Sequence, residues 1–162
     1  MEIGAFIFPT EYSINISELA IQLEDRGYKS LMVCEHTHIP TSRRTPWPGG
    51  GDLPQQYYDT FDPFIALSFA AKATNTIRLG TAICLVPQHN HFNLAKSVAS
   101  LDKLSKGRFV FGIGGGWNVD EMENHGILYK NRFKILFLMK SQIRFYYHQD
   151  LHITLVILTY NK

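Results

Sequence analysis

Four consecutive residues, Glu35-His36-Thr37-His38, bring two imidazoles and a carboxylate together directly after an apolar segment. Imidazole titrates near neutral pH, so it suits proton transfer, and it can also hydrogen-bond a polar cofactor ring. A metal site built on these histidines would need a third ligand, which His89 or His91 could supply, but no cysteine or carboxylate cluster accompanies them. We therefore expect proton or cofactor chemistry here and predict no metal site; histidines that only line a polar rim are the alternative.

A glycine-rich turn is the second stretch that could do chemistry. Residues 107–118 read as a short buried strand, three consecutive glycines at 114–116 and the start of a helix. Without Cβ atoms, the backbone N–H groups of those glycines could approach a flat or anionic ligand closely. Such turns lie at the carboxyl ends of strands, where α/β folds bind their ligands. Glycines that merely permit a tight turn are the alternative interpretation.

The residues around this turn distinguish it from a dinucleotide-binding loop. Counted from Gly112, the fingerprint G-x-G-x-x-G requires glycine where the chain has Trp117. No new strand with an acidic end follows about 20 residues later, as the fingerprint expects. Asn118 followed by Glu121 instead predicts a helix N-cap with its capping-box partner.

Length and composition describe a globular chain of one main domain. The 162 residues are 45% hydrophobic and 19% charged, and the net charge of +2 is too small to argue for a nucleic-acid partner. Cys34 and Cys84 both fall in predicted strands, which favours reduced, buried thiols and a cytoplasmic protein. The first residues do not resemble a signal peptide, and the apolar run 153–160 is too short to span a bilayer.

Strand and helix signals alternate along the chain. Apolar runs predict the strands, and N-cap residues such as Asn15 and Asp62, with stops at Gly27 and Gly107, delimit the helices. This order predicts a parallel sheet with helical crossovers, either half of a (β/α)8 barrel or a small doubly wound sheet. The predicted strands are 3–8, 30–34, 77–86 and 108–113, and the predicted helices are 15–27, 62–74, 94–104, 119–123 and 132–140.

A long connection, residues 35–61, separates the second strand from the next helix. It contains four prolines and three consecutive glycines, and a connection of this length in a compact domain is usually a functional lid or disordered. Arg43 and Arg44 within it could clamp an anionic ligand, although paired arginines in such loops are more often only solvated.

Three motifs together resemble the bacterial luciferase-like monooxygenase family. They are Glu35-His36 after strand two, Leu79-Gly80-Thr81-Ala82-Ile83 in strand three, and the run from Leu101 to Gly114 with its Ser105-x-Gly107-Arg108-Phe109 centre. The longer pieces 35–40 and 42–46 resemble a subgroup of deazaflavin-dependent oxidoreductases. The resemblance covers about residues 1 to 140.

This resemblance implies a fold, a cofactor and a set of site residues. The fold is a (β/α)8 barrel that holds FMN or the deazaflavin coenzyme F420 at the carboxyl ends of its strands, and the activity is oxidation or monooxygenation of a small organic substrate. His36 matches the catalytic histidine near the reactive ring, and Trp47 would cover the substrate side. Ala82–Ile83 matches a non-proline cis peptide beneath the ring. The residues expected to contact the cofactor are Phe6, Phe8, Glu35, Thr81, Ala82, Ile83, Gly114, Gly115, Gly116, Trp117 and Asn118.

The sequence also departs from the family. A closed barrel needs about 250 residues, and the familiar pattern ends near Lys140, so we expect a half-barrel in residues 1–140 with four βα units and a divergent tail in 141–162. Asp120 and Glu121 would oppose an anion at the start of their helix. The alternative to a truncated oxidoreductase is therefore a non-catalytic half-barrel that serves only as an association or vestigial module.

An open half-barrel would expose a strand edge and an apolar face. Three outcomes are open. The chain could be an inactive remnant, it could form a homodimer through the open barrel face, or it could fold as an open sheet with a tail strand, 153–158, added at one edge.

Overall fold

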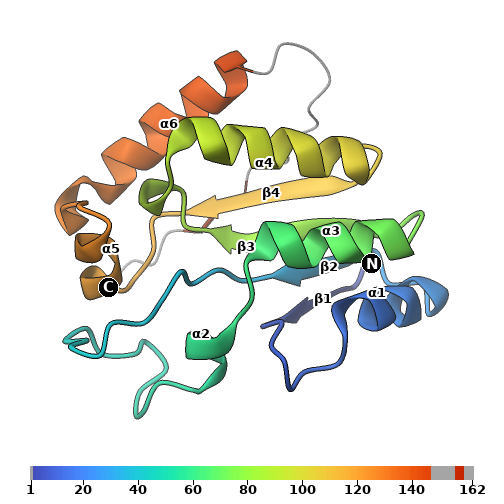
Figure 1. The fold of residues 1–162 in the computed structure, drawn as a ribbon, viewed down its shortest axis with the longest axis horizontal. Helices are drawn as coiled ribbons and strands as arrows, with labels where there is room; N and C mark the ends of the chain where they lie inside the picture. Colours follow the sequence, from blue (N-terminus) through green and yellow to red (C-terminus); the bar gives the residue numbers. More distant parts are fainter. Residues whose placement is uncertain (1, 147–155, 159–162) are drawn as a thin grey trace.

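The structure is a computed structural model that describes residues 2–146 and 156–158. Its sheet has five parallel strands in the order β1-β2-β3-β4-β5, so each strand lies beside the next one in the chain (Figure 1). A doubly wound sheet would reverse its strand order at a switch point, and this one does not. The strands are β1 (Gly4–Ile7), β2 (Ser30–Val33), β3 (Arg78–Cys84), β4 (Phe109–Gly114) and β5 (Val156–Leu158).

Helices follow the strands, and α1, α3 and α4 lie over the same face of the sheet (Figure 1). This alternation confirms the prediction of parallel βα repeats like those of half a (β/α)8 barrel. The short helix α2 lies in the 35–61 connection and was not predicted. The helices are α1 (Ile16–Asp25), α2 (Gln56–Asp59), α3 (Pro63–Ala73), α4 (His91–Leu104), α5 (Val119–Asn124) and α6 (Arg132–Tyr146), with 3₁₀ turns at Val86–Gln88 and Tyr129–Asn131.

Local capping explains where the first helices begin and end. The Asn15 side chain accepts hydrogen bonds from the backbone N–H groups of Ser17 and Glu18, and Asp62 accepts one from Ile65 with proline in the first helical position. Gly27 follows α1 with a φ of +79°, the left-handed conformation that favours glycine. These predicted helix boundaries are confirmed.

The hydrophobic core lies between the sheet and its covering helices. Alternate strand residues face the helices, as the period of two in a strand requires. Their side chains meet the apolar sides of α1, α3 and α4. The main members are Leu31, Val33, Leu79, Phe109, Phe111 and Ile113 from the strands and Ala20, Leu67, Ala70, Leu94, Val98 and Leu101 from the helices.

The opposite face of the sheet carries apolar residues and one glycine. In register across the first four strands lie Phe6, Met32, Gly80 and Val110. A Cβ on Gly80 would come within 2.6 Å of the Met32 sulfur, so this thioether lies directly over the glycine backbone. Phe6 is 53% exposed, which makes this face apolar and partly open.

The tail and the cysteines can be compared with their predictions. Three residues of the predicted tail strand, Val156–Leu158, form β5 and pair in parallel with β4; the rest of 153–158 lies outside the described residues.

Cys34 and Cys84 are buried and unbonded to each other, as predicted. Within the described part of the chain, no helix is both long and apolar enough to cross a membrane.

Glu24 at the end of α1 holds the turn that leads into β3. Its carboxylate accepts hydrogen bonds from the backbone N–H groups of Asn75, Thr76 and Ile77 and from the Thr76 hydroxyl. Desolvation alone would raise the pKa of Glu24, but these hydrogen bonds lower it to about 2. The folded state therefore favours the ionised carboxylate.

We predict that Glu24→Gln lowers the free energy of unfolding by about 1 kcal/mol at neutral pH, because the hydrogen bonds to the carboxylate are weakened. The loss stays this small because solvent largely screens the group. A lowered folded-state pKa gives stability that is complete above the ordinary value of 4.5 and disappears as the pH falls towards about 2. Urea unfolding from pH 7 to 2 should therefore show the two curves converging. Glu18→Gln, where the carboxylate accepts only a side-chain bond from Gln22, is the control; an equal loss there would contradict this assignment.

Candidate active site

The segments that follow β2 and β4 meet at the carboxyl ends of the strands. Because the parallel strands of one sheet end at the same edge, loops that are far apart in the sequence can lie together. The His36 ring centroid is 5.9 Å from that of Trp117, directly after the glycine turn. The sequence predicted that these two stretches share one rim, and the structure confirms it.

A buried histidine–glutamate pair is the centre of this rim. His36 Nδ1 lies 2.8 Å from Glu121 Oε2, and the two side chains are 6% and 0% exposed. Glu121 Oε1 also accepts the backbone N–H of Thr37 at 3.0 Å. A carboxylate can only accept, so His36 must carry its proton on Nδ1, which leaves Nε2 as the ring's acceptor. No described residue hydrogen-bonds Nε2.

The predicted capping box at α5 is wrong. Asn118 stands at the N-cap position, but its side chain makes no capping hydrogen bond, and Glu121 is committed to His36 and Thr37. The tertiary partner supplies buried hydrogen bonds to this carboxylate, which outweigh a local cap. Asn118 is 1% exposed, and neither Oδ1 nor Nδ2 has a hydrogen-bond partner among the described residues.

Asp120 ties the long connection to α5. It accepts the backbone N–H groups of Arg44 and Thr45, the Thr45 hydroxyl and the Arg44 guanidinium. Desolvation alone would raise the pKa of Asp120, but these donors, Arg44 first, hold it well below its ordinary value. Arg44 also forms an ion pair with Glu123, so its guanidinium is bound by two acidic side chains of the protein itself. The two acids at the start of α5 thus serve as anchors for the 35–61 connection.

An aromatic cluster surrounds the His36 ring, with Tyr57 of α2 at its middle. The Tyr57 ring lies 4.6 Å from Phe8, 5.2 Å from His36 and 6.3 Å from Trp117. Its hydroxyl accepts the indole N–H of Trp47 at 3.2 Å. Sequence reasoning missed Tyr57; the one available signal was its place in the long 35–61 connection. We call Phe8, His36, Trp47, Tyr57 and Trp117 the aromatic cluster.

A polar chain leads from this pair to the surface. Thr37 Oγ1 lies 3.4 Å from Glu121 Oε1 and 2.8 Å from Nε2 of the exposed His125. His38 is 3.0 Å from the same hydroxyl through its Nδ1. The buried carboxylate is therefore connected to two surface imidazoles by one hydroxyl group.

The glycines of the turn have different surroundings. A Cβ on Gly114 would lie 2.0 Å from the Ile83 side chain, and one on Gly115 would lie 3.1 Å from Phe133. A larger residue at either position would therefore make the side chain of Ile83 or Phe133 move. Gly116 has a φ of +76° and borders Leu85, Met122 and Gln88.

The strand that precedes the 3₁₀ turn carries the predicted cis peptide. The bond Ala82–Ile83 is cis, as the sequence resemblance implied, and the β3–β4 register shifts between Thr81 and Cys84. Thr81 is buried, and its hydroxyl donates to the carbonyl of Gly112 at 2.7 Å. The Thr81 hydroxyl, which was expected to contact the cofactor, is therefore used in a hydrogen bond between β3 and β4.

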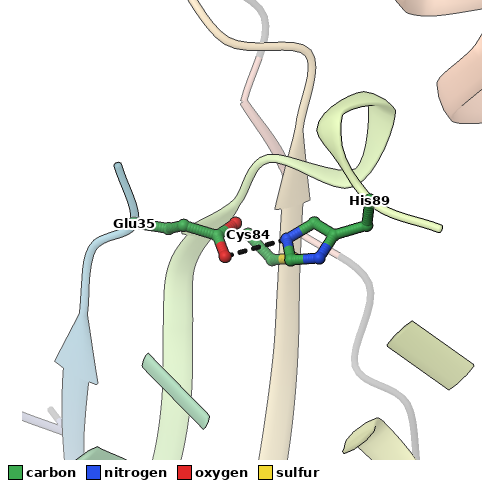
Figure 2. Close-up of side chains that lie close together, drawn as sticks. All are labelled: Glu35, Cys84 and His89. Carbon is green, nitrogen blue, oxygen red and sulfur yellow. Dashed lines mark hydrogen bonds and ion pairs between the residues drawn. The ribbon is translucent and has the colours of Figure 1, made fainter. Parts of the chain in front are cut away.

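Glu35 belongs to a different group from its neighbour His36. One carboxylate oxygen accepts the backbone N–H of Leu85, and the other lies 2.8 Å from His89 Nε2 (Figure 2). Cys84 lies beside this pair, so the donor atoms of the three residues fall within 4.8 Å of one another. This set shares only His89 with the histidine arrangement that the sequence analysis considered and did not adopt as a metal site, and it places the Glu35 carboxylate in internal contacts.

We predict that Glu121→Gln moves the His36 proton from Nδ1 to Nε2, because the amide N–H₂ would then face Nδ1 as a donor. Nitrogen-15 shifts of the His36 ring measure the tautomer directly. The free energy of unfolding should fall by about 2 kcal/mol, since a buried charged hydrogen bond is lost. Glu123→Gln removes only a surface pair and should cost less than about 0.5 kcal/mol. An unchanged tautomer in Glu121→Gln would refute the pairing.

Comparisons with known proteins agree on one family. A family model described as luciferase-like monooxygenase matches residues 1–136. The uncharacterized protein Rv0953c of Mycobacterium tuberculosis is 42% identical over 130 residues, which cover 78% of this chain and 46% of that protein.

Solved structures show the same fold. The oxygenating constituent of 3,6-diketocamphane monooxygenase from Pseudomonas putida, in complex with FMN, has a TM-score of 0.69 at 22% identity, covering 88% of this chain and 38% of that one. An F420-dependent secondary alcohol dehydrogenase in complex with an F420-acetone adduct has a TM-score of 0.70 at 22% identity, covering 92% and 42%. The chain thus spans less than half the length of each of these proteins.

Proposed function

Because this chain belongs to the luciferase-like monooxygenase family, we propose that it functions as an oxidoreductase or monooxygenase that uses reduced FMN or F420 on a small organic substrate. The observation that carries this proposal is the His36–Glu121 pair, buried among aromatic rings at the carboxyl ends of the strands. Barrel enzymes place their chemistry at this end.

The residues of the chain have separate tasks in this proposal. A bound flavin or F420 would supply hydride transfer or oxygen activation. His36 holds or moves a proton at Nε2, because Glu121 fixes the proton on Nδ1 and orients the ring. Tyr57 and Trp117 exclude water from the ring's surroundings, and Trp47 covers the substrate side.

Two buried polar side chains support the fit of a polar planar cofactor. Both amide atoms of Asn118 and the Oε1 atom of Gln88 are buried without a hydrogen-bond partner among the described residues. Buried polar groups are costly unless paired, so a ligand with complementary donors and acceptors would satisfy them. Gln88 borders Gly116, which puts it beside the glycine turn. The ring faces would rest on Phe6, Phe8, Ala82, Ile83 and Trp117.

A second role is favoured by the open face of the sheet. Phe6 is 53% exposed there, and the chain spans less than half of its relatives, whose remaining residues could cover the corresponding face. We propose a second copy of this chain as the occupant, since each copy presents the same exposed Phe6 with the half-buried Met32 beside it in register. Association alone, without catalysis, is the alternative function.

Intrinsic fluorescence tests cofactor binding at the proposed place. The chain has two tryptophans, Trp47 and Trp117, and both belong to the aromatic cluster. We expect FMN or F420 to quench their emission with saturation, and His36→Ala to lose turnover while binding changes only a few-fold. Absence of quenching by both compounds up to about 100 μM, equivalent to roughly 5.5 kcal/mol of binding, would overturn the proposal.

Asn118→Leu separates a binding role from a structural one. Replacing a buried, unpaired amide by an apolar group of similar size should leave the free energy of unfolding unchanged or higher. Cofactor affinity should fall about tenfold, which is 1.4 kcal/mol. The exposed Asn93→Leu on α4 should change neither quantity. A loss of stability in Asn118→Leu with unaltered affinity would contradict the assignment.

Sedimentation equilibrium tests the homodimer. We expect a dimer that Phe6→Asp converts to a monomer, because a charge in a buried apolar interface is costly. Phe69→Asp, at an exposed position on α3, should leave the dimer intact. A monomeric wild-type chain at about 100 μM, where an interface of 5.5 kcal/mol would be half-populated, would exclude this occupant.

A further inference from the structure

A second chemical group lies at the rim beside the histidine–glutamate pair, and the proposed function does not use it. Glu35 follows β2, Cys84 ends β3, and His89 precedes α4 (Figure 2). Glu35 and Cys84 are 4% and 0% exposed, whereas the His89 side chain is 20% exposed. Three potential metal donors therefore converge from three separate elements.

A buried ion pair accounts for only part of this group. Glu35 and His89 form one at 2.8 Å, and the Cys84 thiol lies beside the same carboxylate. The Cys84 thiol, the Glu35 carboxylate and the His89 imidazole together form a set of donors that a cation would complete.

We propose that Glu35, Cys84 and His89 bind one divalent transition-metal ion, with Zn²⁺ as the best match. Sulfur, nitrogen and oxygen donors together suit zinc, which also tolerates irregular tetrahedral geometry. Around zinc, bonds of about 2.0–2.3 Å put neighbouring donors roughly 3.3–3.8 Å apart. The donors lie within 4.8 Å, so rotations of the three side chains bring them to bonding positions.

Charge balance favours the exchange of protons for metal in this buried place. In the bound state, Zn²⁺ is cancelled by the Glu35 carboxylate and the Cys84 thiolate, with neutral His89. Because the thiol has to lose its proton to bind the ion, binding releases a proton and leaves the group without net charge.

His89 is the side chain through which an ion would enter. It is the most exposed of the three, and it follows the 3₁₀ turn Val86–Gln88 rather than lying within a strand. Three protein ligands leave the fourth position to water. The ion would join the ends of β2 and β3 to the start of α4, so its effect is on the rigidity of the rim.

Cobalt binding tests this site without any cofactor or substrate. The reduced, chelator-treated chain is titrated with Co²⁺, followed by displacement with Zn²⁺. We expect one Co²⁺ per chain, an intense thiolate-to-cobalt absorption band, and release of the thiol proton in weakly buffered solution. Cobalt bound to the half-buried His38 and the exposed His125 would give no thiolate band. Binding without that band, or without proton release, overturns the proposal.

Matched substitutions assign the ligands. Cys84→Ser should remove the thiolate band and Cys34→Ser, at the other buried cysteine, should keep it. His89→Gln should weaken Co²⁺ binding at least tenfold, whereas His91→Gln should leave it within twofold of the wild type. Circular dichroism confirms that each variant is folded, and the wild-type titration decides the question if one is not. A band that survives in Cys84→Ser refutes the site.

Discussion

The carboxylate of Glu121 is the contact on which the arrangement of the rim depends. It lies on a helix of six residues after β4, yet its partners are the ring of His36 and the backbone of Thr37 after β2. A buried carboxylate without donors would be strongly destabilising, so the two segments have to meet. This requirement fixes the tautomer and direction of the His36 ring in the absence of any ligand.

Asp120, next to Glu121, binds the long connection 35–61 in the same way, through donors from distant residues. Asp120 collects four donors from Arg44 and Thr45, so the middle of residues 35–61 is held by α5. The far end of the connection returns through Tyr57, whose ring contacts His36 and Trp117. The connection is therefore anchored at both the polar and the aromatic side of the site, which fits a cover that is ordered before ligand binds.

The elements of the fold were predictable because their signals are local. Asn15, Asp62 and Gly27 delimit helices through contacts within four residues, and apolar runs mark the strands. The partners of Glu121 were not predictable, since they lie 84 and 85 residues away and override the local capping pattern. Tyr57 was missed for the same reason: no periodicity marks a ring placed by distant contacts. The cis bond at Ala82–Ile83 followed from resemblance and not from residue pattern.

The glycines on the sheet face opposite the helices have a geometric consequence. Barrel interiors are normally filled by layers of bulky side chains from their own strands. Here Gly80 and Gly112 offer backbone only; a Cβ on Gly112 would collide with the Thr81 carbonyl at 2.1 Å. At Gly80 the space is already taken by the Met32 sulfur and the Val110 carbonyl, and at Gly112 by the backbone of β3. Both glycines therefore let neighbouring strands approach closely, and a larger residue at either position would push strand backbones apart.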